Sequence, residues 1–485
     1  MAYEYKFDTT VQLLKYKVLR SLIKRRYQGS MDESVYLDIP KEISPGPNAT
    51  MRCCVYKERA ILQERIRISL GGDKSNPNVV EVIDIACDEC PSAGVYVTDA
   101  CRGCISHKCM DACPKGAISI INQKSVVDKA KCVECGRCSQ VCPYSAIVVR
   151  RRPCMKACKV NAITMDADFK AKIDNDKCVH CGACIAQCPF GAIQDKSYVM
   201  DVIDLLLGSY NNYNYKVYAM LAPAIASQID YASMGQIVSA LKILGFYRVT
   251  EAAVGADICL HKEAEEWKEH GIMTTSCCPA FVSFIEKNYP TLAKYVSSSL
   301  SPMVEAAKVI KRNDPTAKVV FIGPCSAKKM EFKLEKTGGA IDCVLSFEEM
   351  IAYIDALEID MARLEETPLD DASYYGRIFA KSGGIKEGVV AVAKQAGIEG
   401  INPVSMNGLE ECKRELALLK ANRSTYNFFE GMACEGGCIG GALNLHRDPK
   451  GMRLLDKFNA SATKKDISTS VEKYKASLEK EQEQQ

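Results

Sequence analysis

Cysteines at regular spacing are the first feature of this sequence that could do chemistry. Three segments each carry four cysteines separated by two to four residues and end in a Cys-Pro step. In such a run three thiolates can hold one iron-sulfur cubane, and the fourth, turned away at the proline, ligates a neighbouring cluster. The runs are Cys101, Cys104, Cys109, Cys113; Cys132, Cys135, Cys138, Cys142; and Cys178, Cys181, Cys184, Cys188. The spacing predicts [4Fe-4S] clusters; zinc knuckles or unliganded core thiols are the alternative, although zinc sites rarely repeat this run.

A fourth, incomplete copy lies between the second and third runs. Cys154 and Cys158 are followed by Ala-Ile, as the complete runs are, but the first two cysteines of this copy are missing. An upstream pair, Cys87 and Cys90, could supply them. Sixteen cysteines then form four sets, in which each run's last cysteine serves the other cluster. The sets are Cys101, Cys104, Cys109, Cys142; Cys132, Cys135, Cys138, Cys113; Cys178, Cys181, Cys184, Cys158; and Cys87, Cys90, Cys154, Cys188. The alternative is three clusters with spare thiols, because a C-x2-C pair alone is a weak signal.

Three further cysteine loops lie far apart in the second half of the chain. They are Thr275-Ser276-Cys277-Cys278-Pro279, Gly323-Pro324-Cys325-Ser326-Ala327-Lys328-Lys329-Met330-Glu331 and Glu430-Gly431-Met432-Ala433-Cys434-Glu435-Gly436-Gly437-Cys438. In this order the loops resemble the TSCCP, PCxxKxxE and ExMxCxGGC signatures of the [FeFe]-hydrogenases, over about residues 200–450. The upstream cysteine runs resemble the electron-relay domains of that family.

The resemblance implies a catalytic H-cluster, a cubane joined through one cysteine to a two-iron unit that carries CO, cyanide and a bridging dithiolate. Carried over by position, the cubane ligands are Cys278, Cys325, Cys434 and Cys438, with Cys438 as the bridge. The residues agree with the first part of this expectation, because four thiolates complete a cubane. The two-iron unit rests on the resemblance alone.

A proton path is also implied by the resemblance. Cys277 resembles the proton-relay thiol, Glu263 and Glu266 resemble the relay carboxylates, and Ser297 resembles the hydroxyl that links them. The two glutamates are three residues apart, so a helix would place them on one face. Without the three loops, a solvated helix face would be the better interpretation of this pair, because glutamate is mostly exposed.

Two more residues and several departures from the family pattern complete the expected site. Lys328 resembles the residue that donates to a cyanide ligand, a charge-assisted contact suited to an anionic cofactor. Met432 is expected to pack near the cluster. The family commonly has other residues at four positions, and these departures predict a divergent subgroup whose surroundings tune the metal differently. They are Phe281, Gly323, Ala224 and Met303.

Apart from its 26 cysteines, the chain has an ordinary globular composition. Its 485 residues suggest about three domains, and 47% hydrophobic with 25% charged residues argues against disorder. A net charge of +3 gives no reason to expect a nucleic-acid partner. The N-terminus lacks the apolar region of a secretory signal, and the apolar stretch 217–226 is too short to cross a bilayer. We expect no membrane association and a cytoplasmic location, where closely spaced cysteines are better interpreted as metal ligands than as disulfides.

The resemblance implies two kinds of fold that position these residues: α+β ferredoxin-like iron-sulfur domains, followed by an α/β H-cluster domain of the [FeFe]-hydrogenase type. The pattern of strands and helices after about residue 200 agrees with an α/β domain. The expected divisions are a segment of unassigned role at 1–80, relay domains at 81–198, the catalytic domain at 199–455 and a polar tail at 456–485. Residues 318–322 predict a buried strand that feeds a loop, and Ser346 with Glu349 predicts a helix capping box. The last 20 or so residues predict a surface helix or a frayed end.

The expected function is the reversible interconversion of protons and H₂ at the H-cluster. Three or four accessory [4Fe-4S] clusters would relay electrons to or from ferredoxin or a similar carrier, and hydrogenase maturation proteins would supply the two-iron unit. The basic run 150–152 is a candidate docking site for an acidic carrier, or simply a solvated turn. Two alternatives are a hydrogenase-like iron-sulfur assembly factor and a slow hydrogen sensor.

Overall fold

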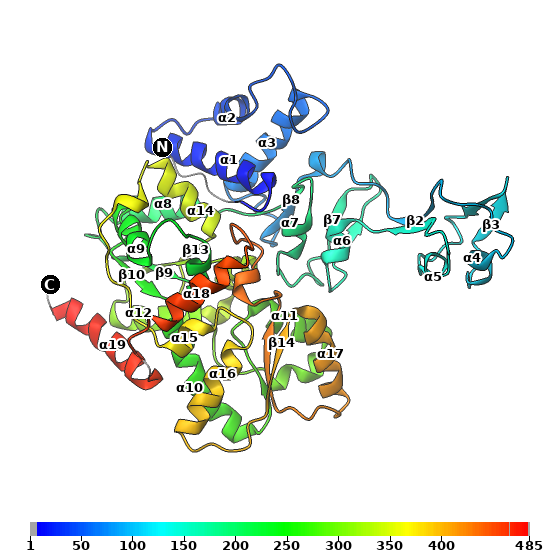
Figure 1. Ribbon diagram of the computed structural model, residues 1–485. Coiled ribbons are helices and arrows are strands. Elements are labelled where there is room, and N and C mark those ends of the chain that lie inside the picture. The colour runs from blue at the N-terminus through cyan, green and yellow to red at the C-terminus, as the bar shows by residue number, and fades with distance from the viewer. Residues whose placement is uncertain (1–6, 465, 484–485) are drawn as a thin grey trace.

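The computed structural model describes residues 7–464 and 466–483, which form four parts (Figure 1). A large domain carries two parallel sheets. Two small cysteine-rich modules extend from it as an arm, and three N-terminal helices lie over the junction between the arm and the large domain. None of the helices in the described part of the chain combines the length and the apolar character needed to cross a lipid bilayer.

The large domain contains a four-stranded and a three-stranded sheet, and every pair of neighbouring strands is parallel. The first sheet has the order β10-β9-β12-β13 and the second β11-β15-β14. Parallel sheets are usually covered on both faces, and β9, β12 and β13 of the first sheet are accordingly almost entirely apolar. The strands are β9 (Val217–Leu221), β10 (Arg248–Glu251), β11 (Met273–Thr274), β12 (Lys318–Ile322), β13 (Cys343–Leu345), β14 (Pro403–Asn407) and β15 (Phe428–Met432). The α/β class and the strand at 318–322 are confirmed.

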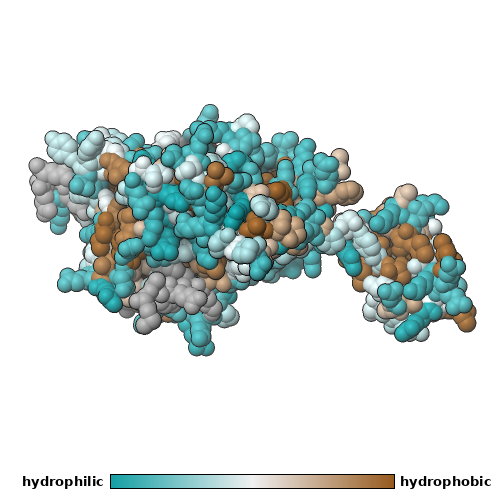
Figure 2. Space-filling view, turned by 90° about the horizontal axis from the view of Figure 1, so that it is seen from above, coloured by the Kyte–Doolittle hydropathy of each residue, from teal (hydrophilic) through white to brown (hydrophobic). Residues whose placement is uncertain are grey.

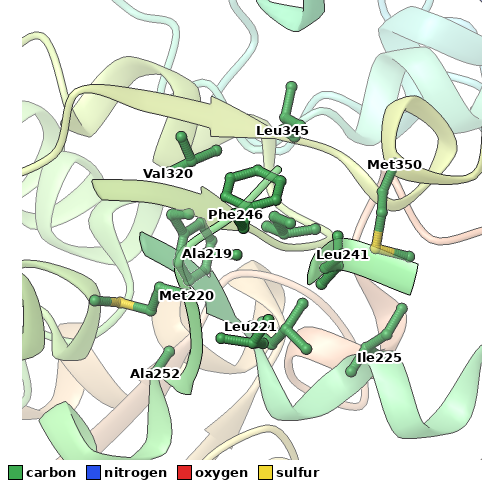
Figure 3. Packing of buried hydrophobic residues seen from close by; sticks show 14 of the residues in the cluster. Ala219, Met220, Leu221, Ile225, Leu241, Phe246, Ala252, Val320, Leu345 and Met350 are labelled. Atoms are coloured by element: carbon green, nitrogen blue, oxygen red, sulfur yellow. The ribbon is translucent and has the colours of Figure 1, made fainter. Parts of the chain in front are cut away.

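Helices cover both sheets of the large domain. They are α8 (Val199–Gly208), α9 (Met234–Ile243), α10 (Ala253–His270), α11 (Pro279–Asn288), α12 (Pro302–Asn313), α13 (Ser326–Glu331), α14 (Phe347–Ala356), α15 (Tyr374–Ile378), α16 (Gly384–Gln395), α17 (Leu409–Lys420), α18 (Lys450–Ala460) and α19 (Ile467–Glu483). The capping box at the start of α14 is confirmed, because Ser346 and Glu349 exchange both of its hydrogen bonds. The main core packs side chains of β9, β12 and β13 against Leu241 of α9 and Met350 of α14 (Figure 3).

Short 3₁₀ turns connect several of these elements. They are η1 (Asp84–Ala86), η2 (Pro223–Ser227), η3 (Pro290–Tyr295), η4 (Glu335–Thr337), η5 (Met361–Arg363) and η6 (Cys438–Gly440). The apolar stretch 217–226 is strand β9 followed by η2, and all five strand residues are buried. Its hydrophobicity therefore serves the core.

The cysteine-rich part consists of two modules, one inserted into the other. The proximal module contains β1 (Val80–Val82), α6 (Pro153–Ala157), β6 (Ile163–Met165), β7 (Ala171–Ile173), α7 (Ala183–Gln187) and β8 (Ile193–Asp195). The distal module contains β2 (Gly94–Val97), α4 (Lys108–Asp111), β3 (Ile118–Ile121), β4 (Lys124–Val127), α5 (Arg137–Gln140) and β5 (Ile147–Arg150). Its first and last strands pair with each other, Gly94 opposite Arg150. The distal module is therefore an insertion that leaves and re-enters the proximal module at one place.

The insertion explains the incomplete cysteine copy. Cys87 and Cys90 precede the distal module, and Cys154 and Cys158 follow it. The two halves of one cysteine run are thus separated by a whole module in sequence, while the chain returns to the same place in space. Figure 2 shows the distal module as a separate lobe with apolar residues on its surface; among them are Ile105, Ile121, Val133 and Tyr144.

The N-terminal segment 1–80, to which the sequence assigned no role, contains three helices that touch both neighbours. They are α1 (Thr10–Tyr27), α2 (Val35–Ile43) and α3 (Val55–Ser69). Leu19 and Ile23 of α1 belong to the core of the large domain. Ile61 and Ile68 of α3 belong to a cluster that also contains Cys87. The helices therefore clamp the proximal module onto the large domain.

A buried charge network joins the same three parts. Lys15 of α1 and Lys329 of α13 share the carboxylate of Asp195 at 2.6 and 2.8 Å, and Lys329 also binds Glu349 at 2.8 Å. All four side chains are almost wholly buried. Paired in this way, the charges do not carry the penalty of an isolated buried ion, but breaking one pair would be costly.

Helix α19, near the C-terminus, has one exposed polar side and one buried side. Ile467, Ser470, Tyr474 and Leu478 of α19 are buried, and this side faces α10 and α12. The surface helix expected for the last 20 or so residues is present, and it is docked through this stripe of side chains.

Candidate iron-sulfur centres and proton path

Four turns of the same geometry follow the last cysteine of each run. In each turn the backbone N–H of the alanine four residues later donates to the cysteine sulfur at 3.2–3.3 Å. The residue before the alanine has a left-handed conformation, with φ between 49° and 58°. These residues are Gly116, Ser145, Asn161 and Gly191. The turn at Cys158 matches the others although it lacks proline, so the incomplete copy is a structural repeat.

The distal module brings together two sets of four thiols. One pocket is lined by Cys101, Cys104, Cys109 and Cys142, and a second is lined by Cys113, Cys132, Cys135 and Cys138. In both pockets the fourth cysteine comes from the other run, the exchange expected of a two-cluster ferredoxin.

The proximal module brings together two more sets. The thiols of Cys181, Cys178 and Cys158 lie near that of Cys184, and they add to the effect of burial in raising its pKa. Burial, followed by the neighbouring thiols of Cys188, Cys87 and Cys90, raises the pKa of Cys154 to about 11. The structure thus places Cys87 and Cys90 beside the two cysteines with which they were grouped.

The donor sets suit clusters better than single ions. In the described part of the chain, no three His, Cys, Asp or Glu side chains converge closely enough to hold one metal ion. A zinc ion, about 2.3 Å from each sulfur, would need such convergence. Beside Cys87 and Cys90 the guanidinium of Arg152 is buried, and its Nε has no hydrogen-bond partner. An anionic cluster would supply the missing counter-charge at this site.

Cysteines from the three distant loops meet in the large domain. Cys278 follows β11, Cys325 follows β12, and Cys434 and Cys438 follow β15, so all lie beyond carboxyl ends of parallel strands, where α/β sheets place their sites. Burial, together with the neighbouring thiol of Cys278, raises the pKa of Cys325 to about 11. Burial and the thiols of Cys325 and Cys278 raise that of Cys438 to about 12. Burial, Cys325, Cys278 and Cys438 likewise raise the pKa of Cys434, so the four thiols lie close to one another, as a cubane requires.

The proximal module touches these loops directly. The hydroxyl of Ser326, next to Cys325, donates to the carbonyl of His180 at 2.7 Å. A Cβ on Gly182 would lie 2.5 Å from the oxygen of Ser326 and 2.6 Å from Ala442, so only glycine permits this approach. Cys181, between His180 and Gly182 in the sequence, is partly buried and packs in one cluster with Cys278. Burial raises the pKa of Cys181, and Cys278 is among the thiols that add to this effect. The set at Cys181 is therefore the relay set that adjoins the four-thiol site.

The expected relay thiol and the first carboxylate lie together in the interior. Cys277 is 9% exposed, and burial, Cys278 and Glu263 all raise its pKa. Glu263 is fully buried on α10; one carboxylate oxygen accepts the N–H of Ser276 at 3.4 Å, and the other has no partner. Burial, followed by the charges of Glu266 and Glu430, raises its pKa to about 8.

The second carboxylate lies one helical turn further out. Ser297 donates its hydroxyl proton to Glu266 at 2.7 Å, and the N–H of Ser298 donates to the same carboxylate at 2.9 Å. Glu266 is half-buried, whereas Glu263 is enclosed. The structure shows no direct hydrogen bond between Ser297 and Glu263. The N–H of Ser297 donates to the carbonyl of Thr274 at 2.9 Å, and the N–H of Ser299 donates to the hydroxyl of Ser297 at 3.1 Å. The side-chain hydroxyls of Thr274 and Ser299 are buried without partners, and ordered water commonly satisfies such groups.

Lys328 and Met432 also border the site. Burial disfavours the charged form of Lys328. Glu331 accepts a hydrogen bond from the Lys328 ammonium at 2.7 Å, and its negative charge raises the pKa of Lys328 above the ordinary value. The same ammonium donates to the carbonyl of Cys277 at 3.3 Å. Met432 is 3% exposed and packs in one cluster with Cys277.

The sequence did not assign a role to two glutamates that shape the centre, Glu331 and Glu430. Glu331 orients Lys328, and it also accepts the hydroxyl of Ser301 at 3.0 Å. Glu430 accepts the N–H groups of Gly383 and Lys386 at 2.7 and 2.9 Å, at the start of α16, where a carboxylate is favoured. Both glutamates stand in the signature loops, so their place in the motifs was a signal that they could have a role.

One expected surface residue is in fact internal. Arg150 and Arg151 are exposed, but Arg152 is 3% exposed and points toward Cys87. The docking site expected at 150–152 therefore cannot include Arg152. The basic run gave no indication of this, because the distal module separates Arg152 from Cys87 in the sequence.

Comparison with known proteins identifies the same three parts. Residues 215–442 match the family described as "Iron only hydrogenase large subunit, C-terminal domain". Residues 93–145 and 152–192 each match a "4Fe-4S dicluster domain". The first of these two segments falls in the distal module and the second in the proximal module, which confirms the ferredoxin-like fold of both.

The chain is similar to characterised hydrogenases along most of its length. It is 30% identical over 404 residues to iron hydrogenase 1 of Clostridium pasteurianum, covering 71% of this chain and 69% of that one. It is 30% identical to the periplasmic [Fe] hydrogenase large subunit of Nitratidesulfovibrio vulgaris, covering 65% and 85%. The cytosolic Fe-S cluster assembly factor NAR1 of Yarrowia lipolytica is 23% identical, covering 47% and 63%.

A solved structure of a variant of the [FeFe]-hydrogenase HydA1 from Chlamydomonas reinhardtii covers 57% of this chain and 93% of its own, with a TM-score of 0.46 and 19% identity. The family match, the length shared with iron hydrogenase 1 and the paired cluster modules agree on one assignment. The chain belongs to the iron-only hydrogenase family.

Proposed function

We propose that this protein is an [FeFe]-hydrogenase that interconverts protons and H₂ at an H-cluster held by Cys278, Cys325, Cys434 and Cys438. When bound, the H-cluster supplies the redox chemistry at the reacting iron. The observation that carries the proposal is the proton route beside these thiols: a buried thiol, Cys277, next to a buried carboxyl. Positioned acids and bases of this kind accelerate proton transfer.

The route begins at a group that water can reach. Glu266 is half-buried and hydrogen-bonded to Ser297, so it exchanges protons with solvent and with that hydroxyl. Glu263 is enclosed, with a pKa of about 8, so its carboxyl is mostly protonated at neutral pH and still able to release a proton. Cys277 then holds the proton nearest the reacting centre. One bridging water, at the unpartnered hydroxyls of Thr274 and Ser299, would connect Ser297 with Glu263.

The surroundings of Lys328 suit an anionic cofactor. Its ammonium has two protein acceptors, Glu331 and the carbonyl of Cys277, and an ammonium has three donors. One donor remains for an anionic ligand such as cyanide, and burial strengthens that contact. Glu331 fixes the direction in which the ammonium points.

Four accessory cubanes complete the proposed electron path. The two distal sets lie at the outer end of the arm, the set at Cys154 lies at its base, and the set at Cys181 borders the large domain. A carrier would exchange electrons at the arm, and we propose a small acidic protein such as ferredoxin. The exposed Arg150 and Arg151 are its proposed docking residues, because complementary charge accelerates encounter. Maturation proteins would have to deliver the two-iron unit, and the many free thiols suit a reducing, cytoplasmic compartment.

A second candidate is an iron-sulfur assembly factor, which the similarity to NAR1 proteins favours. Such a protein must hold cubanes, but it has no evident need of Cys277, Glu263 and Lys328 in these positions. A slow hydrogen sensor would use the same centre and differ in rate.

Infrared spectroscopy of protein matured with the two-iron machinery separates these functions. The hydrogenase should show CO and cyanide bands together with H₂ production from a reduced viologen. Full cubane iron without those bands and without H₂ would refute the proposal in favour of the assembly factor. The bands combined with turnover far below that of the known hydrogenase from Clostridium pasteurianum would instead favour the sensor.

A further inference from the structure

Two buried arginines surround one of the four accessory ligand sets. Arg152 donates from one terminal nitrogen toward the sulfur of Cys87 at 3.8 Å and from the other to the carbonyl of Cys90 at 3.3 Å. Arg152 is only 3% exposed, and its Nε has no hydrogen-bond partner. No carboxylate pairs with it among the residues that the structure describes.

Arg65 approaches the same set from α3. It is 2% exposed and donates to the side-chain oxygen of Gln194 at 2.8 Å and to the carbonyl of Gly191 at 2.7 Å. Both acceptors are neutral, and its Nε also lacks a partner. Gly191 lies in the turn after Cys188, where a Cβ would come within 2.3 Å of the guanidinium. Burial lowers the pKa of Arg65 to about 10, and the charges that oppose this effect are those of Cys188 and, more weakly, Glu348.

A buried guanidinium without an anion is unfavourable, and two at one set require a shared counter-charge. The cluster proposed above for Cys87, Cys90, Cys154 and Cys188 would supply it, since four thiolates make the group a net anion. Reduction adds one electron and no proton, so the cluster becomes one unit more negative. Positive charge beside it therefore stabilises the reduced form more than the oxidised form.

The neighbouring set has a different environment. Cys181 and Cys184 are only partly buried. Its lysine, Lys287, is exposed and donates to the carbonyls of Asn175 and Cys178. Lys156 and Lys159, which line the same pocket as Cys181, are exposed as well, so solvent screens the positive charge beside this set. The cations beside the set at Cys181 are thus exposed, whereas those beside the set at Cys87 are buried.

We propose that Arg65 and Arg152 are the charge partners of the cluster at Cys87, Cys90, Cys154 and Cys188, and that they hold its reduction potential above that of the cluster at Cys181. With a cluster bound at these cysteines, the two arginines would favour an electron on it over one on the cluster at Cys181, which adjoins the proposed H-cluster site. The N-terminal helices acquire a role in this arrangement, because α3 carries Arg65 and the contacts of α1 fix α3 in place. The inference rests on the fourth accessory cluster of the proposed function, but not on hydrogen turnover.

The test is an EPR-monitored redox titration of the full chain with reconstituted clusters. Arg65→Gln and Arg152→Gln remove one positive charge each, and the matched control Arg151→Gln removes an exposed charge one residue away. At a fixed potential, each buried substitution should lower the ratio of reduced to oxidised form of one cluster about tenfold. That ratio corresponds to about −59 mV for a one-electron couple. Arg65→Lys and Arg152→Lys should restore most of the change, which a packing effect alone would not do.

A further substitution should change the reduced fraction of this cluster in the opposite direction. Glu89, between Cys87 and Cys90, binds Arg52 at 3.2 Å, and its side chain is 41% exposed, so Glu89→Gln should fold. It frees Arg52 and should raise the reduced fraction of the same cluster. If the glutamine variant at one of the two arginines loses iron, the shift in the variant at the other decides the proposal.

The outcomes separate the inference from its premise. An iron content equal to three accessory clusters in the parent protein would remove the fourth cluster and the inference with it. Full iron with unchanged titrations in all variants would overturn the inference and leave the cluster count intact. The expected shifts in a protein without hydrogenase activity would support the inference and refute the proposed function.

Discussion

The raised pKa of Glu263 predicts opposite pH dependences for the two directions of the reaction. At pH 7 a carboxyl with a pKa of about 8 is about nine-tenths protonated, whereas at the ordinary value of 4.5 it would be about 0.3% protonated. Proton reduction needs the protonated form to deliver a proton, so its rate should fall as pH rises through about 8. Hydrogen oxidation needs the ionised form to accept one, so its rate should rise up to about the same pH. The groups that face Glu263 are Cys277, Cys259, Glu266 and Glu430.

The charge of Glu266 contributes to the raised pKa of Glu263, so replacing Glu266 should lower that pKa without removing the carboxyl of Glu263. Carboxylates three residues apart on a helix lie about 6 Å from each other. With an effective dielectric constant of about 40, chosen because Glu266 is partly exposed, their repulsion is about 1.4 kcal/mol, or about one pKa unit. Glu266→Gln should therefore move both pH profiles toward lower pH by up to about one unit. Glu263→Gln should abolish the inflection and reduce turnover by about 10²–10⁴-fold, the usual contribution of a positioned acid or base.

The assay measures H₂ production from reduced viologen and H₂ uptake with an oxidised dye between pH 6 and 10, on protein whose H-cluster content is fixed by infrared absorption. Glu265→Gln, on the exposed side of the same helix, is the matched control and should leave both profiles unchanged. The reasoning is refuted if Glu263→Gln keeps the inflection near pH 8. It is also refuted if Glu265→Gln and Glu266→Gln shift the profiles equally.

Three other predictions follow from the site. Cys277→Ala should keep the iron content of the parent and lose most turnover, and full activity in that variant would contradict the relay role. The double substitution Cys87→Ser with Cys90→Ser should lower iron by about four atoms per chain, and an unchanged count would leave three accessory clusters. Replacing Arg150 and Arg151 together by Gln should slow ferredoxin-linked turnover at low salt but not turnover with a small neutral dye. The deficit should shrink as salt rises, because screening weakens the attraction in the parent too; equal rates at low salt would exclude this docking site.

The cluster ligands could be proposed from sequence because their chemistry is local. A run of thiols and a Cys-Pro step set the loop that wraps a cubane, so spacing alone identified three of the runs. The strand at 318–322 and the capping box at Ser346 were predictable for the same reason: each depends on a few adjacent residues. The two-iron unit, in contrast, could be expected only from the resemblance to the family.

The parts that sequence could not supply depend on distant contacts. Arg152 belonged by pattern to a surface run, and only the pairing of β2 with β5 brings it back to Cys87. Arg65 stood in a charged segment with no motif, and its burial follows from the packing of α3 on the proximal module. The exposure of Glu266 relative to Glu263 depends on which side of α10 the large domain covers, and the charges in that helix do not reveal it.

The single point at which the distal module leaves and re-enters the chain also bears on how this architecture could have arisen. Because Gly94 and Arg150 are paired neighbours, a segment carrying two sets of four thiols could be gained or lost there without moving the strands on either side, as domain insertions at adjacent ends are generally tolerated. The length of the proposed electron path is thus separable from the large domain that it would serve. A single insertion could therefore have converted an ancestor with one cysteine-rich module into a protein with two. Such an insertion would leave one cysteine run split in the sequence, as Cys87 and Cys90 are separated from Cys154 and Cys158 here.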